Sequence, residues 1–194
     1  MDTSIGFVGA DYVLFITDKS QARSILKMKG DLDKTFTIDT NKVFALSGDA
    51  GDRENFAHYI QKNIHLYQHR TGLRLSTKAA AHFARGEMAK AIRESIYQAN
   101  VLIGGVDEEG ASLYYLDYLG SLHKMPFAVQ GYASNLTLSI FDRYYKKGLS
   151  VQEGLELARL CVEQLKTRFL ISQPDFVVKI VDKEGVRELP SISV

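Results

Sequence analysis

The clearest periodic pattern in the chain lies near its C-terminal end and predicts an amphipathic helix. Apolar residues there recur at spacings of four and three, in the series Val151, Leu155, Ala158, Val162, Leu165 and Phe169. This spacing places them on one helical face. Ser150 and Glu153 have the spacing of a capping box, in which each side chain bonds the other residue's backbone N–H. We therefore expect a helix that begins just after Ser150 and buries one side.

Three further segments are predicted to be helical. One face of residues 50–70 carries Phe56, Tyr59, Ile60, Ile64 and Tyr67, and one face of residues 76–98 carries Ala80, Ala84, Met88, Ala91 and Ile92. Thr71 and Gly72 separate these two helices, and glycine is a common residue just after a helix end. A shorter helix is expected over residues 134–145.

The remaining apolar segments predict two blocks of strands. The first covers roughly residues 3–47, with a less regular excursion at 21–33, and the second comprises residues 101–106, 112–117 and 127–130. A last strand is expected at 176–182, followed by a turn and a short return. Residues 12–16 and 101–103 are apolar at every position, so both faces of these strands must be covered.

Two strand blocks, each followed by a pair of helices, favour an α+β fold with two stacked sheets between two helical layers. We therefore predict a four-layer α-β-β-α sandwich that forms one domain over residues 1–194. The periodicity alone also fits an ordinary α/β fold, in which helices cover both faces of a single sheet.

Composition narrows the class of protein only slightly. The chain is 45% hydrophobic and 24% charged, with a net charge of +1, which gives no reason to expect nucleic acid or a membrane surface as a partner. One cysteine, Cys161, cannot form an internal disulfide, so we expect a reducing compartment. No apolar run approaches ~20 residues, and the start of the chain lacks signal-peptide features. On these grounds cytosol, nucleus or both remain open, and our expectation is a cytoplasmic and nuclear location.

Three residues that could take part in catalysis lie at the ends of predicted strands. Asp18 ends an apolar strand, Lys34 lies at the edge of the next, and Gly48 follows a third strand and opens a helix. Because an unpaired buried charge is costly, Asp18 and Lys34 are expected to form a buried ion pair.

Acid, amine and glycine in this order resemble the pattern of proteasome beta subunits, which are N-terminal nucleophile hydrolases. The resemblance extends over the whole chain. It is carried by Gly9-Ala10-Asp11-Tyr12, Met28-Lys29, Asp33-Lys34, Gly48-Asp49-Ala50-Gly51-Asp52, Phe56-Ala57, Tyr59-Ile60-Gln61-Lys62-Asn63, Leu113-Tyr114-Tyr115-Leu116-Asp117-Tyr118, Pro126-Phe127-Ala128, Gly131-Tyr132, Leu136-Thr137-Leu138-Ser139-Ile140, Asp142-Arg143-Tyr144-Tyr145 and Lys166-Thr167-Arg168-Phe169.

The resemblance implies a catalytic framework without its nucleophile. In active members an N-terminal threonine, exposed by removal of a propeptide, attacks the peptide bond. Asp18 and Lys34 match the residues that activate it, and Gly48 matches the glycine whose N–H stabilises the oxyanion. The nucleophile position is occupied by Asp2, and only Met1 precedes it, so we expect no such processing.

At least one supporting position also departs from the pattern that the resemblance implies. In the segment Gly131 to Ser134, Tyr132 replaces the first serine of a glycine-serine loop that supports the N-terminal amine. The later supporters fall near Phe169 and Ser172. These departures concern the chemistry and leave the pattern of the fold intact.

The implied function is that of a non-catalytic structural subunit in the beta ring of the 20S proteasome core. It would support assembly and the proteolytic chamber for ATP- and ubiquitin-dependent protein degradation. The implied partners are beta subunits of the same and the opposite ring and alpha-ring subunits, with assembly chaperones as further candidates. No cofactor, metal, nucleic acid or membrane is implied.

Two alternatives differ in class. The chain could be an active N-terminal threonine hydrolase whose mature start is Thr3, although the register places Asp2 over the amine site; Ser4 is the other nearby hydroxyl. A self-assembling homo-oligomeric ring is disfavoured, because such a ring needs an active subunit.

Several other residues have plainer interpretations. The spacing of His58, His65 and His69 could hold a metal, but no HExxH arrangement or nearby cysteine supports it, so surface or interface histidines are favoured. Gly104 and Gly105 indicate close backbone packing. Cys161 is expected to be an inert buried thiol. The tyrosines of interest are Tyr114, Tyr115, Tyr118, Tyr144 and Tyr145. Tyr114 and Tyr115 are expected on opposite faces of a strand. For the group as a whole, packing in the core and contact at an interface both remain open.

Overall fold

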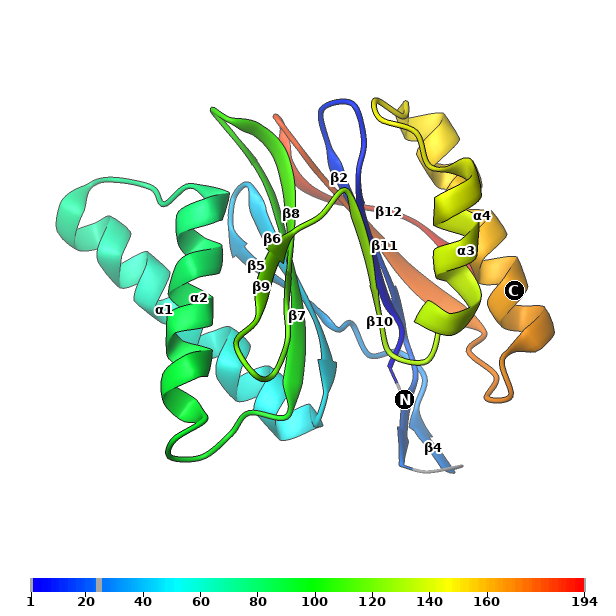
Figure 1. Cartoon of the computed structure of the whole chain (residues 1–194), viewed down its shortest axis with the longest axis horizontal. Coiled ribbons are helices and arrows are strands. Elements are labelled where there is room, and N and C mark those ends of the chain that lie inside the picture. Colours follow the sequence, from blue (N-terminus) through cyan, green and yellow to red (C-terminus); the bar gives the residue numbers. More distant parts are fainter. Residues whose placement is uncertain (1, 24–25, 194) are drawn as a thin grey trace.

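Two antiparallel sheets lie face to face in the middle of the molecule, and a pair of helices covers the outer face of each (Figure 1). The structure is a computed structural model that describes residues 2–23 and 26–193. Helices α1 and α2 cover one sheet, and α3 and α4 cover the other. This arrangement confirms the predicted α+β sandwich of four layers.

The first sheet has the strand order β10-β1-β2-β11-β12, and all of its pairs are antiparallel. Its strands are β1 (Ser4–Val8), β2 (Val13–Asp18), β10 (Phe127–Gln130), β11 (Asp175–Asp182) and β12 (Gly185–Ser193). All residues of β2 are buried, as the uninterrupted apolar pattern of this segment predicts. The return after residue 182 is longer than expected and forms the full edge strand β12.

The second sheet has the order β5-β6-β7-β8-β9 and is also antiparallel. Its strands are β5 (Thr35–Asp39), β6 (Lys42–Gly48), β7 (Ala99–Asp107), β8 (Gly110–Leu116) and β9 (Leu122–Lys124). The three-residue strand β9 is absent from the prediction. Two short strands, β3 (Gln21–Arg23) and β4 (Leu26–Lys29), pair with each other in the irregular excursion.

The four helices are α1 (Ala50–Thr71), α2 (Thr77–Ala91), α3 (Ser134–Tyr144) and α4 (Val151–Arg168). The capping box of Ser150 and Glu153 is present at the start of α4, and Gly72 caps α1 in a left-handed conformation. Both features confirm the sequence prediction. Within the described residues, no helix is long and apolar enough to cross a membrane.

The predicted end of the second helix at residue 98 is wrong, because α2 ends at Ala91. The Gln98 N–H donates to the Asp52 carboxylate at 2.8 Å, and the Asp49 N–H donates to the Gln98 carbonyl at 2.8 Å. These bonds hold residue 98 beside the start of α1, where the chain enters β7. No glycine or proline marks this end in the sequence.

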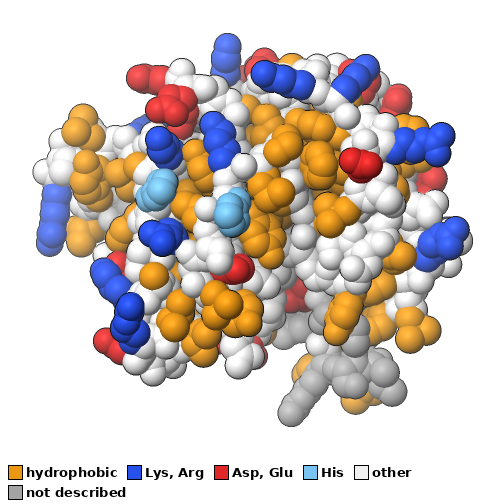
Figure 2. All heavy atoms as spheres, in the orientation of Figure 1, with side chains coloured by type: hydrophobic (Ala, Val, Ile, Leu, Met, Phe, Trp, Pro, Cys, Tyr) orange, Lys and Arg blue, Asp and Glu red, His pale blue; other side chains and the backbone are white. Residues whose placement is uncertain are grey.

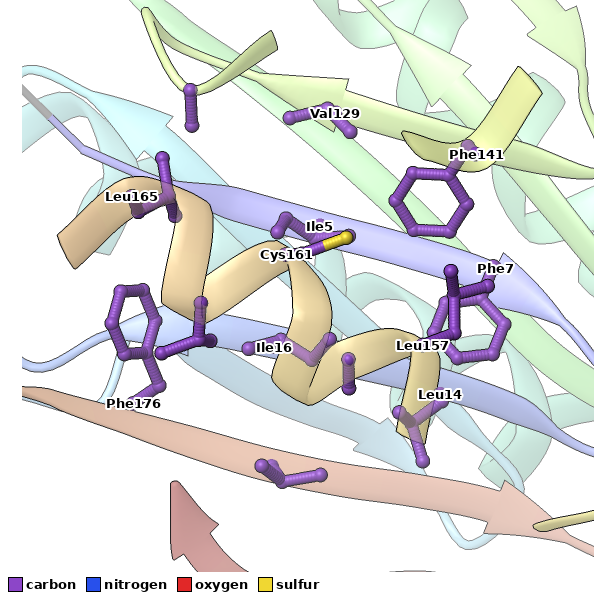
Figure 3. Packing of buried hydrophobic residues seen from close by; sticks show 14 of the residues in the cluster. Ile5, Phe7, Leu14, Ile16, Val129, Phe141, Leu157, Cys161, Leu165 and Phe176 are labelled. Carbon is purple, nitrogen blue, oxygen red and sulfur yellow. The ribbon is translucent and has the colours of Figure 1, made fainter. Parts of the chain in front are cut away.

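Hydrophobic side chains fill three layers. Those between the sheets include Val13, Phe15, Val43, Ala45, Leu102 and Leu113. The layer beneath α3 and α4 contains Phe7, Leu14, Phe141 and the buried Cys161 (Figure 3). A Cβ added at Gly104 would lie 2.5 Å from the Phe15 ring, which confirms that this glycine permits close packing between the sheets.

The tyrosines occupy different environments. Tyr114 is buried among the residues under α1 and α2, whereas Tyr115 packs against the layer between the sheets, so the two side chains point to opposite faces as predicted. Tyr118 and Tyr144 are exposed. An interface role of the exposed tyrosines stays a prediction.

Candidate functional site

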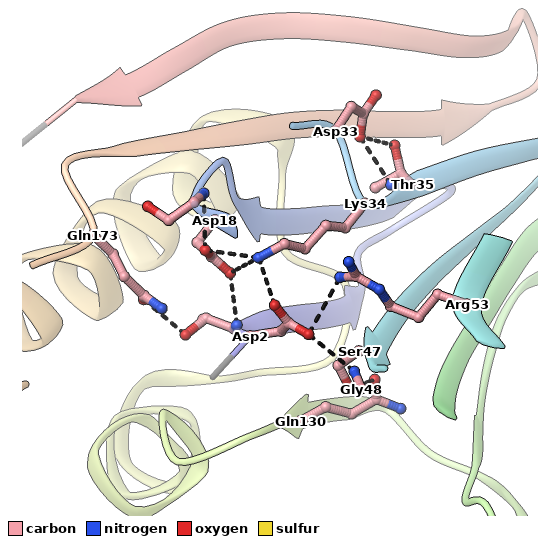
Figure 4. Close-up of polar contacts among 12 residues, drawn as sticks. Asp2, Asp18, Asp33, Lys34, Thr35, Ser47, Gly48, Arg53, Gln130 and Gln173 are labelled. Atoms are coloured by element: carbon pink, nitrogen blue, oxygen red, sulfur yellow. Dashed lines mark hydrogen bonds and ion pairs between the residues drawn. The ribbon is translucent and has the colours of Figure 1, made fainter. Parts of the chain in front are cut away.

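The polar residues singled out in the sequence meet at one end of the sandwich. Asp18 ends β2, Lys34 directly precedes β5, and Gly48 ends β6. Strand β1 pairs with β2 through Ser4 and Thr17, which brings the residues before β1 next to Asp18. Figure 4 shows the resulting cluster of charged side chains around Asp2 and Lys34.

Asp18 and Lys34 form a buried ion pair, as the sequence predicts. The Lys34 Nζ lies 2.8 Å from each carboxylate oxygen of Asp18, and both side chains are fully buried. The Asp18 carboxylate also accepts the N–H groups of Thr3 at 2.7 Å and Ser20 at 3.0 Å. Four hydrogen bonds therefore offset the cost of burying this carboxylate.

Asp2 faces the same amine from the other side. Its Oδ1 lies 2.8 Å from the Lys34 Nζ, and its Oδ2 accepts the Gly48 N–H at 2.9 Å. The Asp2 carboxylate therefore lies between Lys34 and Gly48. In the family that the chain resembles, the matching lysine activates the nucleophile and the matching glycine binds the oxyanion. Behind it, a Cβ at Gly131 would lie 2.0 Å from the Asp2 carbonyl oxygen, and Gly131 has φ +80, so this position favours glycine.

Arg53 completes the cluster and was missed in the sequence. It lies in the first turns of α1, is 5% exposed, and places its Nη1 3.2 Å from the Asp2 Oδ2. Nη1 makes no hydrogen bond of good geometry, so the contact with Asp2 is an ion pair of imperfect alignment. Arg53 could have been identified from its position five residues after Gly48, on the buried side of a predicted helix.

The two carboxyl groups are shifted in opposite directions. Burial raises the pKa of Asp2, but the charges of Lys34 and Arg53 and the hydrogen bonds from Lys34 and Gly48 outweigh it, so the pKa lies below its ordinary value. Burial also dominates at Asp18 and raises its pKa, since Lys34 and the Thr3 N–H offset the desolvation only in part and the Asp2 charge adds to the rise.

Thr3 points away from this cluster. Its hydroxyl donates to the Gln173 Oε1 at 2.8 Å, and its side chain is fully buried. Ser4 is also fully buried, within β1. The sequence placed later supporting residues near Phe169 and Ser172, yet Ser172 is exposed and its neighbour Gln173 reaches the site. Only the pairing of β2 with β11 brings this segment close.

A pocket of about 480 Å³ opens beside Asp2. It is lined by Ser47, Gly48, Asn100, Gly131, Tyr132, Ser134 and Asn135 together with Asp2. Tyr132 is 62% exposed at its rim, and the Ser134 hydroxyl donates to the Gly131 carbonyl at 2.8 Å. The pocket gives solvent a path to the carboxylate, whose side chain is 11% exposed.

The histidines of α1 lie away from the cluster. The His65 Nε2 is 2.8 Å from the Ile38 carbonyl oxygen, and the His58 Nε2 is 3.4 Å from a Glu54 oxygen. In the part of the chain that the structure describes, no group of three or more His, Cys, Asp or Glu side chains is arranged to hold a metal ion.

Comparison with known proteins agrees with this geometry. The sequence model of the family described as "Proteasome subunit" matches residues 1–181. The chain is 47% identical over 189 residues to proteasome subunit beta type-2-B of Arabidopsis thaliana, covering 97% of this chain and 95% of that protein. It is 45% identical to proteasome subunit beta type-2 of Dictyostelium discoideum, covering 98% of both chains. It is 39% identical to proteasome subunit beta type-4 of Saccharomyces cerevisiae, covering 97% of both.

These matches confirm the resemblance to proteasome beta subunits, and in particular to the fourth eukaryotic beta subunit, also called type 2. The family model covers most of the chain, and the relatives are matched over nearly their full length. The chain therefore belongs to the proteasome subunit family, and its relatives there are the eukaryotic beta type-2 and type-4 subunits.

Proposed function

We propose that this chain is a non-catalytic subunit of the beta ring of the 20S proteasome core, which supports assembly and helps to enclose the chamber where other subunits cut substrates. The observation that carries the proposal is the position of the Asp2 carboxylate. It binds both Lys34 and the Gly48 N–H, the two groups that an attacking residue and an oxyanion would need.

Hydrolysis by this fold needs an attacking oxygen, a group that takes its proton, and a donor that is free to bind the developing oxyanion. The Asp2 carboxylate has no hydroxyl to activate, and its two oxygens occupy the Lys34 ammonium and the Gly48 N–H, so neither donor is free for a reaction. The Lys34 Nζ lies 2.8 Å from both the Asp2 and the Asp18 carboxylates, so among the described residues these two groups, and no attacking hydroxyl, are its hydrogen-bond partners.

The alternative, an active hydrolase that starts at Thr3, has less support. The Thr3 hydroxyl is bonded to Gln173, whereas the groups that would activate it lie on the side occupied by Asp2. An attack by Thr3 would require the start of β1 to turn over, and the Thr3 N–H would leave Asp18.

Assembly into a ring is the second part of the proposal. We propose neighbouring beta subunits, the opposite beta ring and the alpha ring as partners, with assembly chaperones as transient ones, in the cytoplasm and the nucleus. The relatives are named as subunits of such a complex, and closed rings are built from many interfaces of moderate strength.

The test is to purify the protein with its natural partners, sequence its N-terminus, and treat the complex with an electrophile that labels catalytic threonines. We expect the electrophile to label other beta subunits, which serve as the internal control, and to leave this chain unlabelled. A chain that begins at Thr3 and carries the label on Thr3 would establish the hydrolase instead. Purification without other proteasome subunits would contradict the proposed assembly.

A further inference from the structure

The groups around the Asp2 side chain form a ready-made site for a carboxylate. Three donors from three separate parts of the fold point at this one group: the Lys34 ammonium before β5, the Arg53 guanidinium of α1, and the Gly48 N–H at the end of β6. Lys34 and Arg53 are 1% and 5% exposed, respectively. Charged donors in such a buried setting bind anions more strongly than they would in water.

Other contacts, which do not involve Asp2, hold two of the donors. Lys34 keeps both hydrogen bonds to Asp18. Gly48 is fixed by its pairing with Ala99 and by a backbone conformation of φ +125, in which a Cβ would lie 2.1 Å from the Gln98 carbonyl oxygen. For Arg53, the third donor, it is the backbone that is fixed, in the first turns of α1, and the ion-pair partner of its side chain is Asp2. The site should therefore keep its shape when the Asp2 carboxylate is removed.

The charge balance at this site also requires an anion. Without Asp2, Lys34 keeps its ion pair with Asp18, but Arg53 loses its ion pair with Asp2, which leaves one positive charge without its partner. The Arg53 Nη1 is a buried atom without a well-formed hydrogen bond, so it retains capacity to donate. The pocket of about 480 Å³ beside Asp2 gives a small anion access to these donors.

We propose that Asp2 is the built-in ligand of a carboxylate-binding site, and that the site binds a small free carboxylate when the Asp2 side chain is absent. The inference concerns the same site as the proposed function. Its experiment measures anion binding and not peptide hydrolysis, so either proposal can fail while the other stands.

The test uses size-matched anions on the full chain, in the assembly in which it purifies. Asp2→Ala removes a carboxylate group, which formate replaces, and Asp2→Gly removes one more carbon, which acetate replaces. Hydrogen–deuterium exchange of the Gly48 amide, followed by mass spectrometry, reports whether its acceptor is present. We expect exchange about tenfold faster or more in both variants, because a bond to a charged acceptor is lost. Formate should restore slow exchange in Asp2→Ala, and acetate in Asp2→Gly, relative to chloride at equal ionic strength.

Asp182 offers a matched control. Its carboxylate also accepts a backbone N–H, that of Glu184, and also pairs with an arginine, Arg187, but Arg187 is about half exposed. In Asp182→Ala, formate should not slow the exchange of the Glu184 amide. In the double variant Asp2→Ala/Arg53→Met, the rescue at Gly48 should be lost or much weaker than in Asp2→Ala.

Two results would overturn the proposal. In the first, the Gly48 amide of Asp2→Ala exchanges as fast in formate as in chloride. In the second, formate slows the exchange of the Glu184 amide in Asp182→Ala by the same factor, which would indicate a general salt effect. If Asp2→Ala folds only when an anion is added, the yield of folded protein in formate is compared with the yield in chloride, and formate should give the higher yield. Equal yields in the two salts would then count against the site.

Discussion

The Asp2 carboxylate joins three segments that are distant in the sequence. It bonds the lysine before β5, the arginine of α1 and the backbone at the end of β6. Each cation is nearly buried, so each depends on this negative charge for compensation. Asp2 is therefore expected to contribute to the stability of this end of the sandwich.

Replacing Asp2 by asparagine should destabilise the protein through this loss of charge compensation. Asp2→Asn keeps the shape of the side chain, but Lys34 then has only the Asp18 carboxylate as an anionic partner and Arg53 loses its ion pair with Asp2. We expect the free energy of unfolding to fall by roughly 3 kcal/mol. Urea denaturation at equal protein concentration measures it. Asp182→Asn is the control, because Asp182 pairs with the half-exposed Arg187, and it should lose less than about 1 kcal/mol. Equal losses in the two variants would contradict the prediction.

The same side chain should make stability depend on pH. Because the folded-state pKa of Asp2 lies below its ordinary value of 3.8, its stabilising contribution is present above that value and is lost as the pH falls through the folded-state pKa. Asp18, whose pKa is raised, acts in the opposite direction. The difference in unfolding free energy between wild type and Asp2→Asn isolates Asp2; it should be nearly constant above about pH 5 and should shrink as the pH falls below the ordinary value of 3.8. A constant difference would be evidence against the assigned shift.

Cys161 should be unreactive while the protein is folded. Its side chain is fully buried under α4, and burial raises its pKa to about 12, so almost no thiolate is present at neutral pH. Iodoacetamide should therefore fail to modify the folded chain and should modify it fully in denaturant. Rapid labelling of the folded protein would contradict this prediction.

Between the two sheets, close packing depends on a glycine in β7. A Cβ added at Gly104 would lie only 2.5 Å from Cζ of Phe15 in β2, so strands from different sheets are in direct contact at this point. Such contact requires that one of the two facing side chains be absent. Gly104 thus helps to set how closely the two sheets approach.

Gly104→Ala should therefore lower stability by about 1–3 kcal/mol, since the Phe15 ring has to move within a filled layer. Gly86→Ala is the matched control, because Gly86 lies inside α2 with no atom within 4 Å of an added Cβ. That change should be stabilising, by about 0.5–1 kcal/mol, through improved helix propensity. Both are measured as shifts in urea midpoint, and a Gly104→Ala variant at least as stable as Gly86→Ala would show that the layers are loosely packed there.

The surface of the isolated chain carries many uncovered apolar side chains. Hydrophobic groups gather in several places on the face shown in Figure 2. Large side chains that are at least half exposed include Leu26, Met28, Leu73, Leu119, Tyr132, Tyr144 and Leu170. Groups of this kind are typical of surfaces that other proteins cover. They support the proposal that the chain functions within a larger assembly.

The chain produced alone should consequently be poorly soluble or form oligomers of mixed size. Size-exclusion chromatography with light scattering would measure this, and production together with partner subunits of the ring should yield a defined complex. A monodisperse, stable monomer would contradict the expectation that these surfaces are interfaces.

Much of the fold could be predicted from local patterns. The helices of residues 50–71 and 151–168 follow from apolar spacing and from caps such as Ser150, and the buried strands follow from segments that are apolar at every position. The errors fall where tertiary contacts decide. Helix α2 ends early because Gln98 is bonded to the start of α1, and β9 is too short to have a pattern of its own.

The candidate site divides in the same way. Asp18, Lys34 and Gly48 could be identified from their places at strand ends and from the family pattern, and that pattern also drew attention to Asp2. Arg53 and Gln173 could not be identified, since their roles depend on side-chain directions and on pairings across many residues, such as β2 with β11. The sequence determines which charged residues the chain contains. Which of them contact the Asp2 carboxylate is decided by the packing of the sheets and helices, because that packing brings distant segments together.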